Sequence, residues 1–310
     1  EYKPEAECPE FEKFLASVVP NDVIDMVWEL IGYMMYSGNP LHKAVMFHGM
    51  GRNGKGTLIR AIQGVIGKKN TTAVTLQALT EERFAPAALF GKLANIAGDI
   101  DGTYMDKTAR FKAITGLDEI HAEFKGKDGF DFTPFAVPLF SANKIPGSAD
   151  VTSGYLGRWV VVPFPHNFTG REDRGLDDRI ANELEGIAAK AIPALQRLMA
   201  RQNFDEPESA KEAMNDFKRK VDQVRTWAED CAELDTEAGH VGRSELYAHY
   251  KEWAKDGGIG QLKNSEFFDR VEALGCVQAK IKGIRGFKGI RIIALPTGEP
   301  LAEERSPFQD

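Results

Sequence analysis

The stretch AVMFHGMGRNGKGTLIR, residues 44–60, decides the fold of this chain. It begins with four apolar residues, the length of a short buried strand, and it leads into a segment whose apolar residues recur at helical spacing. Between them lies a turn with four glycines, where the backbone is free to bend sharply. A strand, a glycine-rich loop and a helix in this order indicate the start of an α/β nucleotide-binding domain.

The glycine-rich loop fits the pattern G-x-x-x-x-G-K. In such loops, backbone N–H groups turn inward around phosphate oxygens, and the helix N-terminus adds the positive end of its dipole. Lys55 would reach the β- and γ-phosphates of ATP. The alternative is a glycine-rich turn with an unrelated lysine, which the flanking strand and helix disfavour. The residues predicted to bind the nucleotide are Gly49, Gly51, Arg52, Asn53, Gly54, Lys55, Gly56 and Thr57.

The loop departs from the usual pattern at one position. Gly56 stands where a hydroxyl is expected to bind Mg²⁺, and Thr57 follows one residue later. Either the Thr57 hydroxyl binds the metal, or Mg²⁺ depends on water and carboxylates. The candidate carboxylates are Asp99 and Asp101, which follow the predicted strand 93–97 and can face the loop across the sheet. The alternative is that they are ordinary aspartates that cap a loop.

The composition is that of an ordinary globular protein. The 310 residues are 43% hydrophobic and 27% charged, with a formal net charge of −7, so disorder is excluded for most of the chain. Three scattered cysteines are too few for a disulfide framework or a zinc site. No apolar run approaches the roughly 18 residues of a membrane span, and no secretory signal is present. We therefore expect a cytoplasmic location and no membrane partner. Because the first residue is Glu1, we expect the chain to be a piece of a longer protein.

Apolar spacing predicts the remaining elements. The predicted helices are residues 11–18, 23–34, 58–66, 176–201, about 210–234, 245–253 and 265–274, and the further strands are residues 93–97, 136–140 and 159–162. A hairpin is expected at residues 122–132, with its turn at Asp128–Gly129, and another at 277–293. Two helices followed by a hairpin is the order of a winged helix. The predicted divisions are an N-terminal helical segment 1–40, an ATPase core 41–200, a helical connector 201–239, a winged helix 240–296 and a tail 297–310.

Polar and cationic residues at the ends of these elements suggest further roles. Asn143 follows a central strand, where an amide can bind the γ-phosphate or the attacking water, or can simply form a turn. Lys125 and Lys127 at a hairpin tip can hold the phosphates of a single strand, or can be solvated surface residues. The last hairpin carries a run of cations that would contact phosphates or keep an exposed edge soluble. These are Lys280, Lys282, Arg285, Lys288 and Arg291.

Together these motifs resemble superfamily 3 helicases, in particular the phage and plasmid primase-helicase branch related to the poxvirus primase-helicase. The similar stretches, besides the loop, are residues 6–9 with the helix after them, 95–101, 111–116 through 125–132, 141–146, 157–165 and the winged-helix region 240–295. Each motif alone is modest, but their order and spacing are specific, and the resemblance covers nearly the whole chain.

The resemblance implies an ATP-driven DNA helicase with an AAA+-like core and bound Mg²⁺. Asp99 would be the retained acidic residue of the strand motif, since Gly98 stands where the family usually has another acid. Asn143 would sense the γ-phosphate, and Arg158 would complete the site of a neighbouring subunit, unless it forms a structural salt bridge. Lys125 and Lys127 would contact single-stranded DNA at a replication fork. The implied assembly is a homo-oligomeric ring, expected to be a hexamer, with an N-terminal primase-polymerase elsewhere in the full chain.

Two other functions compete with this interpretation. The first is a nucleotide-regulated DNA-binding or initiator module, in which Gly56 and Gly98 leave ATP bound but poorly hydrolysed. The second is a small-molecule P-loop kinase. The hairpin lysines and the basic segment 280–291 speak against the kinase, because such an enzyme needs no path for DNA.

Overall fold

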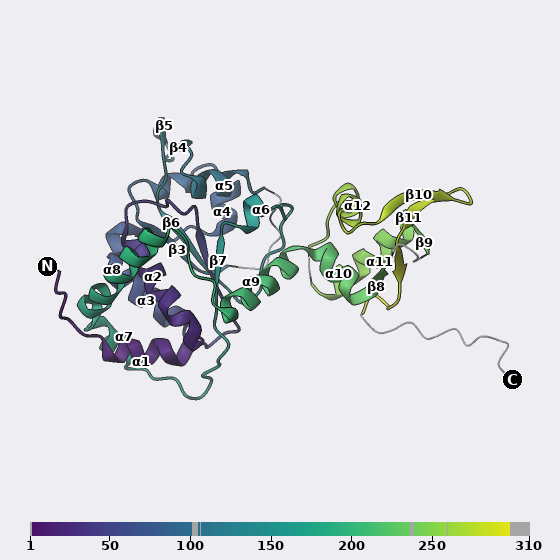
Figure 1. Ribbon diagram of the computed structural model, residues 1–310. Coiled ribbons are helices and arrows are strands. Elements are labelled where there is room, and N and C mark those ends of the chain that lie inside the picture. Colours follow the sequence, from purple (N-terminus) through teal and green to yellow (C-terminus); the bar gives the residue numbers. More distant parts are fainter. Residues whose placement is uncertain (1, 101–104, 106, 236–238, 259, 298–310) are drawn as a thin grey trace. The chain divides into compact units, whose positions relative to one another are not determined.

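The computed structural model describes residues 2–100, 105, 107–235, 239–258 and 260–297 (Figure 1). Asp101 lies outside the described residues, and of Asp99 the backbone alone is described. The chain forms two compact units. The first comprises residues 1–146 and 150–218, and the second comprises residues 147–149 and 219–310.

The first unit contains the predicted strands and most of the predicted helices. Its helices are α1 (Pro9–Val18), α2 (Ile24–Met35), α3 (Lys55–Ile66), α4 (Leu76–Glu81), α5 (Ala109–Gly116), α6 (Ser153–Leu156), α7 (Leu176–Ala181), α8 (Leu184–Arg201) and α9 (Glu208–Val221), the end of which enters the second unit, with 3-10 turns η1 (Asn21–Val23), η2 (Lys68–Asn70) and η3 (Ala85–Leu89). Its strands are β1 (Ala44–His48), β2 (Thr71–Thr72), β3 (Ala94–Ile100), β4 (Ile120–Glu123), β5 (Gly129–Phe132), β6 (Val137–Ala142) and β7 (Trp159–Pro163).

Five of these strands form a parallel sheet in the order β2-β3-β6-β1-β7. Strand β6 lies between β1 and β3, although it follows both in the sequence, and all of its residues are buried. Burial along a whole strand is typical of a parallel sheet covered on both faces. The predicted α/β class is therefore confirmed, and the carboxyl ends of β1, β3 and β6 meet at one edge of the sheet.

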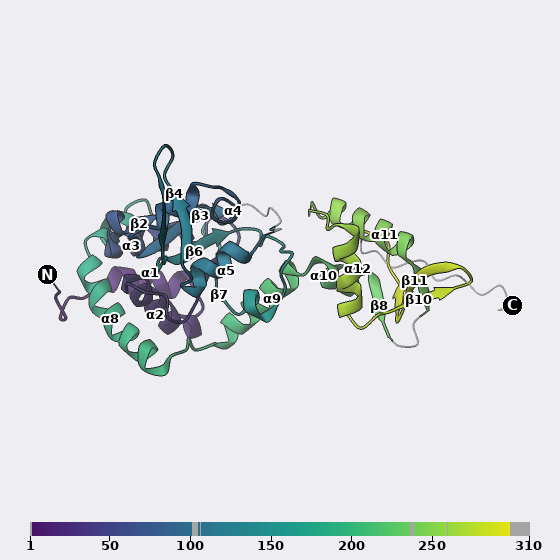
Figure 2. The ribbon, with the colours of Figure 1, turned by 90° about the horizontal axis from the view of Figure 1, so that it is seen from above.

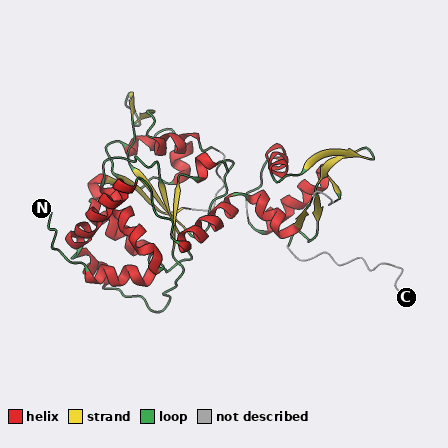
Figure 3. Ribbon diagram, in the orientation of Figure 1, coloured by secondary structure: helices red, strands yellow, loops and turns green. Residues whose placement is uncertain are grey.

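Helices cover both faces of this sheet (Figure 3). On one face, Val45 and Phe47 of β1 pack into a core shared with α1, α2, α3 and α8. On the other, the indole of Trp159 stacks on Phe111 of α5, with ring centroids 4.8 Å apart, and packs against Phe217 of α9. The alternation of side chains along each strand thus supplies apolar contacts to two helical layers.

Helix α3 begins three residues before the predicted start. Gly54 precedes it in the left-handed conformation, and the Leu58 N–H donates to the Gly54 carbonyl at 3.0 Å. The first turn carries Lys55, Gly56 and Thr57, none of which supports an apolar stripe. A pattern of apolar residues therefore could not detect this turn, because its side chains belong to the neighbouring cavity.

The predicted helix 176–201 is divided into α7 and α8. Glu183 lies at the break, and its carboxylate accepts hydrogen bonds from the N–H groups of Glu10 at 3.1 Å and Phe11 at 2.9 Å. These groups belong to the first turn of α1, where N–H groups have no partner within the helix. A negative charge there also favours the helix dipole. The break between α7 and α8 thus places Glu183 against the start of α1. The apolar periodicity of residues 176–201 does not show this contact.

The hairpin β4–β5 is confirmed, but its turn was wrongly placed. The Lys127 N–H donates to the Phe124 carbonyl at 3.0 Å, and Gly126 has φ +77°, so the turn comprises residues 124–127. Gly129 instead pairs with Glu123 as the first residue of β5. The Asp-Gly signal was misleading because the sequence contains a second glycine, Gly126, that suits a left-handed position equally well. The hairpin projects from the first unit (Figure 2).

The second unit contains α10 (Gln223–Cys231), β8 (Ala232–Leu234), β9 (His240–Gly242), α11 (Arg243–Asp256), α12 (Asn264–Ala273), β10 (Val277–Ile281), β11 (Ile284–Lys288) and β12 (Ile290–Ile292). Strands β10, β11 and β9 form an antiparallel sheet, and β12 pairs with β8. The charge-rich helix expected to reach residue 234 is divided at Asp222, whose carboxylate caps α10. Strands β8 and β9 were not predicted, because three residues are too few to show an alternating pattern.

Candidate nucleotide-binding site

The turn from β1 into α3 requires glycine at position 54. Its backbone has φ +91°, a conformation that other residues adopt at a cost. A Cβ atom at this position would also lie 2.5 Å from Cγ1 of Val18 in α1. Both observations explain why the loop can bend so closely against α1 and then begin the helix.

Lys55 is held at the centre of the loop. Its side chain is buried, with 6% exposed, and its Nζ donates to the carbonyl oxygens of Gly49 and Met50. The same Nζ donates to Oδ1 of Asn143 at 3.0 Å. Asn143 directly follows β6, so two predicted site residues that are 88 positions apart in the chain meet at the carboxyl edge of the sheet.

A cavity of about 410 Å³ opens beside this pair. It is lined by Gly51, Arg52, Asn53, Gly54, Lys55, Gly56, Thr57, Ile59, Arg60, Gly98, Ser141 and Asn143. The volume falls within the range of small-molecule sites. The predicted residues 51–57 all line this cavity. Gly49 does not line it, but its carbonyl accepts the hydrogen bond from Lys55. Ser141 was not among the predicted site residues, although its place near the end of β6, two residues before Asn143, was a usable signal.

Residues 167–172, in the segment after β7, form hydrogen bonds and an ion pair with the glycine-rich loop. The Phe168 N–H donates to the Arg52 carbonyl at 2.8 Å, and the Asn167 side chain donates to the Gly51 carbonyl at 3.1 Å. The Arg52 guanidinium forms an ion pair with Glu172 at 2.7 Å. This segment was not predicted, because its residues follow no periodic pattern and their contacts with the loop are tertiary.

A second cavity, of about 430 Å³, adjoins the first and shares Arg52, Gly54, Thr57 and Arg60 with it. Its further lining residues are Phe14, Ser17, Val18, Phe168, Arg171, Glu172, Asp173, Arg174, Leu176 and Asp177. The first cavity lies along the glycine-rich loop and carries Arg52, Lys55 and Arg60, whereas the second combines apolar side chains with charged ones. This pairing suits a ligand with a phosphate chain at one end and a ring at the other.

The predicted metal ligands differ in how far the structure describes them. The Thr57 hydroxyl accepts a hydrogen bond from Arg60 at 3.0 Å, and Arg60 is paired with Asp177 at 2.8 Å. Asp99 has its backbone in β3, next to Gly98 of the cavity, and Asp101 lies outside the described residues. Within the described part of the chain, no group of three histidine, cysteine or acidic residues converges on a metal site. The metal assignments to Thr57, Asp99 and Asp101 remain predictions.

Magnesium at a phosphate site takes one or two carboxylates, ligand phosphates and water. The described residues of the cavity that carry side-chain oxygens are all neutral, and they are Asn53, Thr57, Ser141 and Asn143. These residues fit a metal bound mainly through a nucleotide's own phosphates and through water. The carboxylate predicted to join them is that of Asp99 in β3.

Arg158 lies at the opposite edge of the sheet from the loop. It precedes β7, whose first residue, Trp159, pairs with Ala44 at the start of β1, whereas the loop follows the end of β1. The four residue steps from Ala44 to His48 separate the two ends of β1 by about 13 Å. The guanidinium donates to the Gly154 carbonyl at 3.0 Å and to the Thr115 hydroxyl at 2.9 Å. The geometry therefore separates Arg158 from the loop of its own subunit, and its role toward a neighbour remains a prediction.

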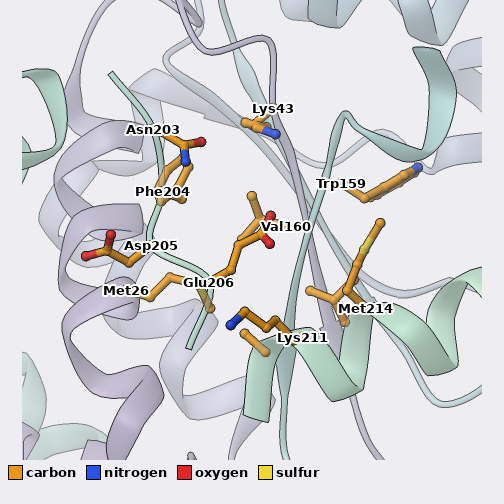
Figure 4. Close-up of a pocket in the computed structure, with 12 residues that line it drawn as sticks. Met26, Lys43, Trp159, Val160, Asn203, Phe204, Asp205, Glu206, Lys211 and Met214 are labelled. Atoms are coloured by element: carbon orange, nitrogen blue, oxygen red, sulfur yellow. The ribbon is translucent and has the colours of Figure 1, made fainter. Parts of the chain in front are cut away.

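A further cavity beside β7 is too small for a nucleotide (Figure 4). Its volume is about 40 Å³, enough for water, and Lys43, Trp159, Glu206 and Lys211 are among its lining residues. Burial lowers the pKa of Lys43, whereas the charge of Glu206 favours the ammonium form. The Lys43 Nζ donates to the Gly157 carbonyl at 2.7 Å. This side chain thus anchors the turn before Arg158.

The predicted DNA-binding lysines are exposed in both units. Lys125 and Lys127 lie in the turn of the β4–β5 hairpin, and the Lys127 Nζ lies 5.7 Å from the centre of the Phe124 ring. In the second unit, Lys280 of β10 is paired directly with Arg285 of β11. Lys282, Arg285 and Lys288 are also exposed on this hairpin, whereas Arg291 of β12 forms an ion pair with Glu233. Their exposure is compatible with phosphate contacts, and the DNA-binding role of these residues remains a prediction.

Asp150 fixes the end of the loop that follows Asn143. Its Oδ2 accepts hydrogen bonds from Lys112 and Thr108 of the α5 region, both at 2.8 Å, and Oδ1 accepts one from the Thr152 N–H at 3.0 Å. Burial alone would raise the pKa of Asp150, but the bonds from Lys112, Thr152 and Thr108 outweigh burial and lower it to about 2.

We expect Asp150→Asn to destabilise the first unit by about 2 kcal/mol at pH 7, since the pKa falls from 3.8 to about 2 on folding. A lowered carboxyl pKa stabilises the fold above about pH 4, and this contribution is lost as the pH falls toward 2. Urea unfolding measures the free energy of unfolding of wild type and variant. We expect the difference between these two free energies to be about half as large at pH 3 as at pH 7. A difference of equal size at both pH values would contradict this origin.

Comparisons with known proteins agree with the fold and suggest a function. A family model described as a family of unknown function (DUF5906) matches residues 47–158. A curated protein of Invertebrate iridescent virus 3, named "Putative helicase 121R", is 22% identical over 321 residues, which cover 91% of this chain and 34% of that protein. The chain thus spans about a third of the length of this helicase-named remote homologue.

Solved structures of the NrS-1 C-terminal region share the fold. One apo structure gives a TM-score of 0.55 at 14% identity, covering 93% of this chain and 77% of that one. Another, of residues 305–718 of NrS-1, gives a TM-score of 0.53 at 16% identity, covering 90% and 66%. No described helix of the chain is long and apolar enough to cross a membrane.

Proposed function

We propose that this chain is the ATP-hydrolysing motor of a DNA helicase of superfamily 3, in the phage and plasmid primase-helicase branch. The observation that carries the proposal is the 3.0 Å contact between Lys55 Nζ and Asn143 Oδ1, beside a cavity at the edge where β1, β3 and β6 end. Ligands of open parallel sheets bind at this edge. The remote similarity to a protein named as a helicase supports the same function.

In this mechanism the chain's own residues position and neutralise the phosphates of ATP. Backbone N–H groups of the loop and the start of α3 surround the β- and γ-phosphates, and Lys55 moves from the carbonyl of Gly49 onto their oxygens. Asn143 orients the γ-phosphate or the attacking water. The adenine ring would occupy the adjoining cavity, where Val18 of α1 and Phe168 supply apolar surface. Mg²⁺, bound through the phosphates with Asp99, would neutralise charge on the leaving group.

Assembly completes the proposed motor. A homo-oligomeric ring, expected to be a hexamer, would bring Arg158 of one subunit to the ATP site of the next, which agrees with its separation from its own loop. The β4–β5 hairpin would line the DNA path with Lys125 and Lys127. The second unit would act as a winged helix, with Lys280, Lys282, Arg285 and Lys288 on phosphates. The full-length protein would also carry an N-terminal primase-polymerase. It would act at the replication fork, in the cytoplasm of the host cell.

A nucleotide-regulated initiator module is the second candidate. Gly98 lines the cavity without a side chain, and the Thr57 hydroxyl accepts its hydrogen bond from the cation Arg60. Both observations favour weak metal binding and therefore slow hydrolysis. Phosphate release, measured with and without single-stranded DNA, separates the two. A motor turns over ATP many times and faster with DNA, whereas an initiator module binds ATP and DNA with little phosphate release under either condition.

Replacing both hairpin lysines should weaken single-stranded DNA binding in a defined way. Each lost phosphate contact lowers the log–log salt slope by about 0.7, so Lys125→Ala combined with Lys127→Ala should lower it by about 1.4. Fluorescence anisotropy over a series of salt concentrations measures this slope. Lys68→Ala, an exposed lysine of η2, is the matched control. An unchanged slope would place the DNA path elsewhere, with the β10–β11 hairpin as the next candidate.

A further inference from the structure

Four phenylalanines form a row along one face of the β4–β5 hairpin. Phe124 stacks on Phe130, with ring centroids 5.5 Å apart and planes at 21°, and Phe130 stacks on Phe132 at 5.5 Å and 30°. Phe90, from the loop before β3, meets Phe130 and Phe132 edge-on at 5.2 and 5.4 Å. The strand register explains the row, because Phe130 and Phe132 lie opposite Ala122 and Ile120 on the same face.

The Phe132 end of the row is buried, but two rings of the set are exposed. Phe132 is buried, whereas Phe124 is 42% exposed and Phe90 is 56% exposed. Large apolar side chains that remain this exposed in a contiguous set often mark a binding surface. More than half of the Phe90 surface therefore stays open to solvent beside the other rings.

The charges near the row favour an anionic occupant. Lys127 lies over Phe124, and Lys125 is exposed in the same turn. Both acidic residues of the strands have local partners, since Glu123 forms an ion pair with Arg83, and the Asp131 carboxylate lies 2.7 Å from the His121 ring nitrogen. Asp128 also lies in the connection, so the tip, with two lysines and one aspartate, keeps a net positive charge.

We propose that Phe124 and Phe90 form a stacking platform for the bases of single-stranded DNA, while Lys125 and Lys127 hold the adjacent phosphates. This inference rests on the proposed DNA-dependent function and adds the group that binds the bases. Every base has a π face, so stacking on phenylalanine holds a strand without selecting its sequence. Aromatic rings with neighbouring cations are the combination that binds single strands in this way. The motor would thus grip bases as well as backbone.

The test compares two oligonucleotides of equal length, one an ordinary single strand and the other abasic throughout. Phe124→Ala and Phe90→Ala should each weaken binding of the ordinary strand by about five-fold or more, since stacking contributes that much per base. Neither variant should change binding of the abasic strand or the salt slope, because no phosphate contact is lost. Phe124→Trp should keep or increase affinity, which guards against a variant that merely disturbs the hairpin. Tyr36→Leu replaces an equally exposed aromatic residue at the end of α2 and is the matched control.

Several outcomes would overturn the platform. Equal loss on both oligonucleotides, or a reduced salt slope in the phenylalanine variants, would mean that the rings only hold the lysines in place. No loss on either would leave the rings without contact to bases. A fall in oligomer mass with Phe124→Ala would assign the face to a second copy of the chain. If the wild type hydrolyses ATP but binds no single strand, the platform fails while the ATPase assignment stands.

Discussion

Lys55→Ala should reduce ATP hydrolysis by at least about 10²-fold, the usual effect of removing one group that stabilises charge in the transition state. The side chain is held between the Gly49 carbonyl and Asn143, so its ammonium is already positioned for the phosphates. The substitution removes the ammonium group that the loop presents to the cavity, and with it the neutralisation of phosphate charge. Phosphate release under saturating ATP measures the loss.

The fold should survive this substitution, because the Lys55 side chain contributes to a ligand cavity and not to the apolar core. Thermal unfolding checks this point, and Lys68→Ala, which alters an exposed lysine just after the same helix, should hydrolyse ATP at the normal rate. A folded Lys55→Ala protein with near-normal turnover would refute the phosphate-loop assignment.

Arg158→Ala should keep ATP binding and oligomer mass but lose turnover by about 10³-fold, the lower end of the effect of an arginine finger. The guanidinium acts on charge that develops in the transition state, so ground-state affinity should hardly change. Turnover, nucleotide affinity and mass in solution are the three measurements, with Arg197→Ala on the exposed side of α8 as the control.

A structural role for Arg158 predicts a different pattern. Its hydrogen bonds to Thr115 and Gly154 tie the turn before β7 to the end of α5. If these bonds are its whole function, Arg158→Ala should lower the unfolding temperature and reduce turnover only in proportion to the fraction unfolded. Normal turnover per folded subunit would exclude the finger.

The sequence allowed the strand–loop–helix at residues 44–66 to be predicted because each part has a strong local signal. Apolar residues mark β1, glycines mark the turn, and Lys55 identifies the chemistry. The position of Asn143 directly after an apolar strand was enough to place it at the same edge of the sheet. Local pattern and tertiary position agree wherever a strand is buried and parallel.

Features that depend on distant contacts were not predictable. Glu183 caps α1 from 172 residues away, and Asn167 supports the loop through a backbone carbonyl. Neither the residue type nor its position in the sequence predicts which distant backbone group such a side chain will bind. The hairpin turn at Gly126 shows a further limit, because two glycines in one short segment offered two possible turns and the strand register chose between them.

The central claim is that a ring of these subunits hydrolyses ATP at sites shared between neighbours, and mixing two inactive variants tests it most directly. An Arg158→Ala subunit beside a Lys55→Ala subunit can form a composite site that retains both groups. We expect phosphate release by the mixture to exceed that of either variant alone and to depend on the mixing ratio. If the two variants assemble together, as mass measurement would show, and no mixture exceeds either variant alone, the shared site is contradicted.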